Sequence, residues 1–136
     1  MRTRLLVIAT GVGLLVAAAP MWAHHAFSAE FDQNKPLKLT GTVTNWEVVN
    51  PHSWIHIDVK GEDGKVTPWM IEGGSPNSLY RLGFNKNSLP PGTEIVVEGY
   101  QAKDKSNRAV GKNVTFTDGK RLFLGLQAAE AEPGAK

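Results

Sequence analysis

The sequence has no cysteine among its 136 residues, and this absence excludes several kinds of protein. Without a thiol there is no disulfide bond, no thiol catalysis, no attachment of c-type haem and no lipid-modified amino-terminal cysteine. The chain also lacks a nucleophile elbow, a glycine-rich phosphate loop and a metalloprotease motif. We therefore expect a fold that is held by its hydrophobic core, and a protein that is not an enzyme.

Long apolar runs are limited to one segment at the amino terminus. A basic start, Met1 to Arg4, precedes an apolar run from Leu5 to Ala19, and the sequence becomes polar after Ala23. This order is typical of a secretory signal peptide, with cleavage after Ala23. A membrane anchor is the rival interpretation, but the run is shorter than the ~20 residues that span a bilayer. The sequence predicts a periplasmic or secreted protein without stable membrane insertion after cleavage.

The chain has no formal net charge once this segment is set aside. The whole chain has 15 basic and 13 acidic residues. The segment 1–23 contains Arg2 and Arg4 and no acidic residue, so the remaining chain has 13 of each. A neutral chain lacks the basic surface that nucleic-acid binding needs, so we expect no nucleic-acid partner.

Apolar residues alternate with polar ones in several short segments, which is the pattern of half-buried β-strands. Strands are expected at 37–46, 52–59, 66–72, 94–100, 110–117 and 120–124. The last two flank Asp118-Gly119 and are either one bent strand or a pair. Gly41 indicates a bulge or a bend, and Pro68 an edge strand or a bulge. A short helix is expected between Ser75 as N-cap and Gly83 beyond its end.

Three strands, a short helix and further strands are the order of an OB-type Greek-key barrel. The predicted fold is all-β with one short helix, a small antiparallel OB-like barrel; the alternative is a small β-sandwich. The predicted organisation is a signal peptide at 1–23, an N-terminal arm at 24–36, the OB-like domain at 37–125 and a disordered tail at 126–136.

One predicted strand has two chemically different faces. His52, Trp54, His56 and Asp58 alternate with Ser53, Ile55, Ile57 and Val59. If the neighbouring strands pair across 47–51 and across Glu62-Asp63, Trp46 and Trp69 join the polar face, and Thr67 and Ile71 lie outward with Trp69. The candidate ligand-binding residues are Trp46, Trp54, Trp69 and Asp58, whose rings would stack on a planar ligand or a sugar. In the alternative interpretation, the rings pack as a second small core.

The four histidines suggest a metal site. Cleavage after Ala23 would make His24 the amino terminus, where the terminal amine and the imidazole chelate together, and a further imidazole would complete a site that suits copper(II). The candidate ligands are His24, His25, His52 and His56. They cannot all bind one ion, because His52 and His56 are four residues apart on a strand, or ~13 Å. Asp58 and His56 could be combined with a nearby serine or threonine into a catalytic triad, but no sequence motif supports one.

Several short motifs resemble a family of small exported bacterial proteins of unknown function. The motifs are His24-His25-Ala26-Phe27, Glu30-Phe31-Asp32, Gly41-Thr42-Val43, Asn50-Pro51-His52, Glu72-Gly73-Gly74-Ser75-Pro76-Asn77 and Arg121-Leu122-Phe123. The resemblance covers residues 24–125; it implies export and transfers no catalytic residue. We expect a non-catalytic binding or accessory module that takes copper or a small ligand. The alternative is a structural or protein-interaction module that docks an envelope protein.

Overall fold

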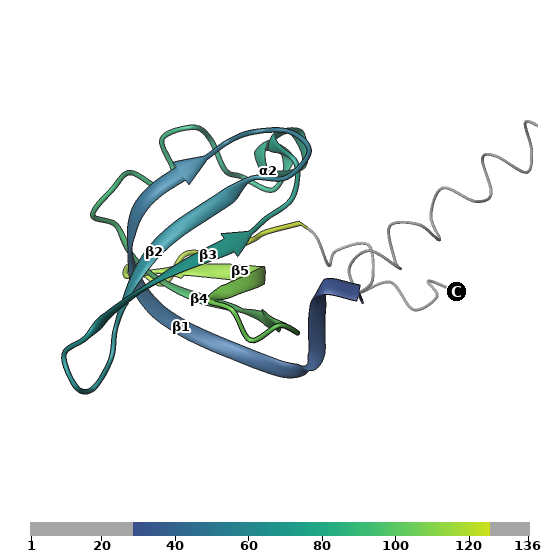
Figure 1. Ribbon diagram of the computed structural model, residues 1–136. Helices are drawn as coiled ribbons and strands as arrows, with labels where there is room; N and C mark the ends of the chain where they lie inside the picture. The colour runs from purple at the N-terminus through teal and green to yellow at the C-terminus, as the bar shows by residue number, and fades with distance from the viewer. Residues whose placement is uncertain (1–28, 126–136) are drawn as a thin grey trace, which may run out of the picture. The chain divides into compact units, whose positions relative to one another are not determined.

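The computed structural model describes residues 29–125, which form six strands and one short helix (Figure 1). In chain order these are β1 (Phe31–Glu47), β2 (Trp54–Lys60), β3 (Val66–Glu72), α2 (Pro76–Arg81), β4 (Glu94–Ala102), β5 (Arg108–Phe116) and β6 (Arg121–Phe123). The predicted signal peptide, residues 24–28 of the predicted arm and the tail 126–136 lie outside the described residues. Residues 31–36 of the predicted arm are part of β1.

The long strand β1 connects two parts of the sheet. Its first part pairs with β4, and its last part pairs with β2. The two pairings overlap at Thr42, the residue after Gly41, and Gly41 itself faces Ile95 of β4. A Cβ atom at Gly41 would come within 2.8 Å of the carbonyl oxygen of Asp58. The prediction of a bend or bulge here therefore has a physical basis in close strand approach, while the register itself shifts slightly later, between Val43 and Asn45.

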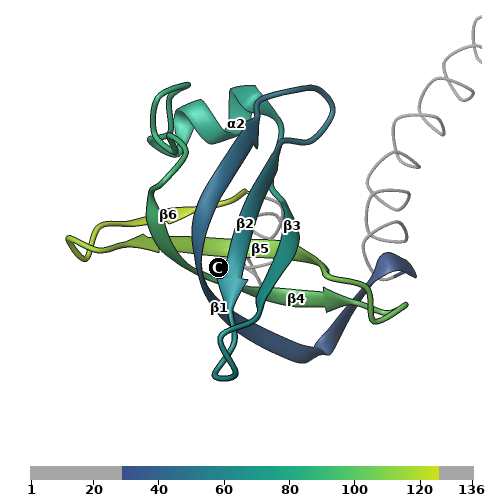
Figure 2. The same cartoon turned by 60° about the vertical axis from the view of Figure 1, so that its left-hand side comes forward.

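Five of the strands form a closed ring (Figure 2). β1, β2 and β3 pair in sequence, β1 also pairs with β4, β4 pairs with β5, and β5 returns to β3. The expectation of an antiparallel sheet is wrong at one place, because β3 and β5 are parallel. A ring with an odd number of strands cannot reverse direction at every step, so one parallel pair is unavoidable. The closure favours the OB-like arrangement over two separate packed sheets, and the all-β fold with one short helix is confirmed.

The alternating apolar residues face the inside of this ring, as the period of two predicts. The fully buried core side chains include Val43, Ile55, Ile57, Ile71, Leu79, Ile95, Val97 and Val114. β-branched residues dominate because they pack well on a pleated surface. Leu79 comes from α2, and Phe84 and Leu89 come from the segment after it. The helix and its following loop thus belong to the same core as the strands.

The predicted boundaries of the helix and two predicted turns are confirmed. The Ser75 hydroxyl accepts a hydrogen bond from the amide of Ser78, which caps the amino terminus of α2. Gly83 has a φ of 99° just after the helix, a conformation that glycine adopts without strain. Gly64 and Gly119 have positive φ in the β2–β3 and β5–β6 turns. The segments around Asp118-Gly119 are therefore a pair of strands. No helix among residues 29–125 is long and apolar enough to cross a membrane.

Candidate functional site

The outer side of β1, β2 and β3 carries a row of three side chains that point away from the core. Trp54 of β2 is the register partner of Glu47 in β1 and of Glu72 in β3. These three residues alternate with Trp46, Ile55 and Ile71, which face the core. Since side chains alternate along a strand, Glu47, Trp54 and Glu72 share the opposite face. We call this surface the Trp54 face.

One carboxylate of the Trp54 face is buried and has an imidazole partner. Oε1 of Glu72 is hydrogen-bonded to Nδ1 of His52. The Glu72 side chain is 9% exposed, whereas the His52 side chain is 43% exposed. An ionised carboxylate can only accept, so the Nδ1 of His52 carries the hydrogen. In the neutral imidazole this leaves Nε2 with a lone pair for an external group.

The second carboxylate forms a more open pair. Nε2 of His56 lies 2.9 Å from Oε1 of Glu47, and the two side chains are 26% and 44% exposed. The hydrogen bond uses Nε2, so Nδ1 of His56 is the nitrogen left for another partner. Asp58, the partner that the sequence suggested for His56, lies opposite Thr42 and Pro68 instead. The hypothetical Asp58–His56 triad is therefore not formed.

The backbone that holds Glu72 and His52 depends on two glycines. Gly73 donates to the carbonyl of Ser53 over 2.8 Å, and Ser53 donates to the carbonyl of Gly74 over 3.0 Å. Gly74 in turn donates to the carbonyl of Leu124 over 2.6 Å. A Cβ atom at Gly74 would lie 2.6 Å from the Ser78 hydroxyl oxygen and 3.2 Å from the Leu124 carbonyl oxygen. These bonds fix the chain on both sides of the His52–Glu72 pair.

Two of the three candidate tryptophans lie on the other side of the sheet. Trp69 is opposite Ile57, and Trp46 is opposite Ile55, so both share the core face. The ring of Trp46 packs on Phe84 with a centroid distance of 5.7 Å and an interplanar angle of 55°. The predicted outward positions of Thr67, Trp69 and Ile71 are wrong for the same reason. Trp46 and Trp69 are therefore packed side chains, but they pack against the main core and not as a second small core.

The error in register has a simple cause. The sequence suggested a two-residue turn at Glu62-Asp63, which would place His56 opposite Trp69. Lys60 pairs with Val66, and the amide of Gly61 donates to the carbonyl of Lys65 over 2.8 Å, so the turn has three residues, 62–64. This longer loop shifts β3 by one residue, and a one-residue shift moves every side chain to the other face. His56 consequently lies opposite Met70.

Sequence reasoning missed the importance of Glu47 and Glu72. The sequence suggests a surface, cap or ion-pair role for Glu72, without a named partner, and it places Glu47 in the connection 47–51. Each is the last residue of its strand, and the carboxylates at those two ends were the available signal. Their partners depend on the register, which the sequence does not determine. The loop 103–107 also approaches this region, because the amide of Met70 donates to the carbonyl of Asn107 over 3.0 Å.

The histidines do not form a metal cluster within the described part of the chain. Residues 29–125 contain no group of three or more histidine, aspartate or glutamate side chains that could hold a metal ion. His52 and His56 are each paired with a different carboxylate. His24 and His25 lie outside the described residues. The described surface therefore offers single imidazole donors, and the side chain of His52 is the more exposed of the two.

Comparisons with known proteins agree with the resemblance noted in the sequence. The comparison with curated proteins finds no match. A family model described as a family of unknown function, DUF6152, matches residues 12–112. This match includes β1 to β4, α2, the Trp54 face and the first half of β5. The chain belongs to this family of unknown function.

Proposed function

We propose that this protein is an exported, non-catalytic binding module that takes a small, hydroxyl-rich ring such as a sugar on the Trp54 face. The observation that carries the proposal is the row Glu47–Trp54–Glu72, in which each carboxylate also binds an imidazole. Trp46 and Trp69 pack against the core, and Trp54 is not among the side chains that pack there in the described domain. An aromatic ring set between two acidic groups on the outside of a sheet suits a ligand better than a core.

The polar groups around Trp54 are mainly acceptors. The carboxylate oxygens of Glu47 and Glu72 accept hydrogen bonds, and so do the remaining nitrogens of neutral His52 and His56. Such a set matches a ligand with several O–H donors. The apolar face of a sugar ring can rest on the indole while its hydroxyl groups donate to this rim. Both imidazoles are already held by carboxylates, so binding orders few additional side chains.

The position of the Trp54 face adds support by analogy with the fold. OB-type domains bind oligosaccharides and oligonucleotides on the face of strands 2 and 3, next to the loops between strands 1 and 2 and between strands 4 and 5. Here His52 lies in the β1–β2 connection, and the β4–β5 loop contacts β3 through Asn107. The balanced charge of residues 24–136 favours a neutral sugar over a nucleic acid.

Export is the part of the proposal that rests on sequence. The basic start, the apolar run and the small residue Ala23 have the order of a signal peptide, and we place the mature protein in the periplasm or outside the cell. Amino-terminal sequencing of protein recovered from the periplasm tests this directly. A terminus at His24 supports it, and a retained Met1 contradicts it.

The experiment that tests the function is a glycan array with wild-type protein and two variants. Trp54→Ala should lose binding to any glycan that the wild type retains, because the stacking surface is removed. Tyr80→Ala is the matched control, since Tyr80 is an exposed aromatic residue on α2 and should bind as the wild type does. Failure of the wild type to bind any glycan, or equal binding by Trp54→Ala, contradicts the proposal.

A second candidate function is copper binding, and the orientation of His52 favours it. A carboxylate that holds Nδ1 of a histidine and leaves Nε2 outward is the usual support of a metal-binding imidazole. Copper(II) would then be held by the amine and imidazole of a terminal His24 together with His52. Copper titration of protein with a verified His24 terminus tests this. Binding that is unchanged in His52→Ala contradicts it.

A further inference from the structure

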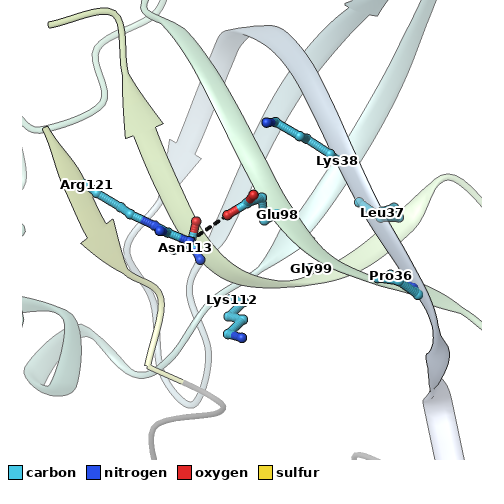
Figure 3. A pocket seen from close by; sticks show the side chains of 8 residues that line it. All are labelled: Pro36, Leu37, Lys38, Glu98, Gly99, Lys112, Asn113 and Arg121. Atoms are coloured by element: carbon cyan, nitrogen blue, oxygen red, sulfur yellow. Dashed lines mark hydrogen bonds and ion pairs between the residues drawn. The ribbon is translucent and has the colours of Figure 1, made fainter. Parts of the chain in front are cut away.

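A pocket outside the Trp54 face is lined by a buried polar side chain that has no partner within residues 29–125. The pocket lies between β1, β4, β5 and β6 and has a volume of about 390 Å³ (Figure 3). Asn113 of β5 lines it and is 0% exposed. Neither Nδ2 nor Oδ1 of Asn113 has a hydrogen-bond partner among the residues that the structure describes. Buried amides are nearly always paired, so an unpaired one beside a pocket is a candidate to bind a small molecule.

The local fold explains why Asn113 faces the pocket. Val114, the next residue, lies in the core opposite Val97, so Asn113 is on the outer side of the sheet. Gly99 pairs with Gly111 and Glu98 pairs with Asn113, which leaves Lys112 as an extra residue in β5. This is a β-bulge, a feature that often changes the direction of a side chain beside a binding site.

Gly99 completes the pocket because it has no side chain. A Cβ atom at Gly99 would lie 2.0 Å from the carbonyl oxygen of Val110, so the strand needs glycine at this position. Gly99 thus allows the close approach of β4 and β5 at the bulge, beside the pocket that it lines.

The charges around the pocket favour an anion. Lys38, Lys112 and Arg121 line it together with one acidic residue, Glu98. Nη2 of Arg121 lies 2.7 Å from Oε2 of Glu98, and Figure 3 marks this ion pair. The pair offsets the negative charge of Glu98, and the two lysines remain as an excess of positive charge at the pocket.

We propose that this pocket binds a small oxyanion that also carries an O–H group, either hydrogen phosphate or a hydroxy acid. Nδ2 of Asn113 donates to an anionic oxygen, and Oδ1 accepts from the O–H group, which satisfies both halves of the amide. Lys38 and Lys112 balance the charge of the ligand. None of the residues that line this pocket belongs to the Trp54 face, so the proposal can be tested independently of sugar or copper binding.

The test is an NMR titration of the purified protein, expressed from the full-length sequence. Phosphate, citrate and sulfate are added separately against a chloride background of constant ionic strength, and the side-chain amide of Asn113 is observed. Phosphate or citrate should give a saturable shift, and the one that does so identifies the source. Sulfate has no O–H group at neutral pH and should bind about five-fold more weakly. No saturation with phosphate or citrate, or equal binding of sulfate, overturns the proposal.

Variants locate the binding. Asn113→Leu should abolish the saturable response, followed at the amide of Gly99. Lys38→Gln and Lys112→Gln replace exposed residues and should each weaken binding about three-fold or more, and Glu98→Gln should strengthen it. Lys60→Gln, an exposed lysine outside the pocket, is the control and should leave the affinity unchanged. If Asn113→Leu fails to fold, wild-type affinity in both lysine variants still overturns the proposal.

Discussion

The Trp54 face and the Asn113 pocket differ in whether the polar group that each one buries has a hydrogen-bond partner. On the Trp54 face the buried carboxylate of Glu72 has His52 as its partner. In the pocket the buried amide of Asn113 has no partner among residues 29–125. A group that is already paired is held in one orientation and presents a prepared surface. An unpaired group costs stability until something binds it, so the two surfaces should respond in opposite ways to substitution.

The largest expected effect on stability comes from a substitution that disturbs the backbone of the pocket. Gly99→Ala places a Cβ atom against the carbonyl of Val110, which is rigid backbone, and should lower the free energy of unfolding by about 3 kcal/mol or more. Urea denaturation measures the loss. Gly61→Ala is the control, because the one atom that its Cβ would approach too closely is the carboxylate oxygen of the flexible, exposed Asp63 side chain. An equal effect of the two variants would contradict the bulge geometry.

Removal of an imidazole sharpens the comparison within the Trp54 face. His52→Ala leaves the carboxylate of Glu72 buried without its partner and should cost about 1–3 kcal/mol. His56→Ala leaves the exposed Glu47 free to hydrate and should cost less than about 1 kcal/mol. Equal losses in urea denaturation would mean that burial of the carboxylate does not distinguish the pairs.

Replacement of the unpaired amide should have the opposite sign. Asn113→Leu keeps a similar side-chain volume and removes two buried polar atoms, so it should stabilise the protein by about 1 kcal/mol when no ligand is present. Thermal unfolding in a phosphate-free, citrate-free buffer measures this change. A clear loss of stability would show that the amide already has a partner, and the contrast between the two faces would disappear.

The smallest effect concerns the loop beside β3. The Ser106 hydroxyl donates to Oδ1 of Asp104 over 2.6 Å, and with the Ser106 amide it lowers the pKa of Asp104 below its ordinary value. A folded pKa below the unfolded one gives stability that is present above the unfolded pKa and is lost as the pH falls through the folded pKa. Ser106→Ala should move the pKa of Asp104 upward, as carboxyl-carbon NMR can measure. An unchanged pKa would exclude the hydroxyl as the main cause.

The sequence was informative where local chemistry decides the structure. Alternation located all six strands, and Ser75, Pro76 and Gly83 delimited the helix. These features depend on neighbouring residues and on the burial of one strand face. Element order was then sufficient to predict an all-β fold with one short helix.

The faces were harder to predict because they depend on register. One extra residue in the β2–β3 turn moved Trp69 to the core side, and the irregularity between Val43 and Asn45 separates the two halves of the β1–β2 pairing. The Asn113 pocket draws on four strands and on a bulge, so no local pattern indicates it. Sequence thus predicted Trp54 and His52 as candidates, but it did not predict the acidic partners Glu47 and Glu72.

The central claim is that the Trp54 face is the binding surface for a hydroxyl-rich ring. The most direct measurement is a nitrogen-proton NMR titration of the indole N–H groups with a panel of soluble mono- and oligosaccharides. We predict that a binding sugar shifts the Trp54 indole resonance and leaves those of Trp46 and Trp69, which pack against the core, nearly unchanged. A panel that leaves Trp54 unmoved, or a sugar that shifts Trp46 or Trp69 instead, would contradict the claim.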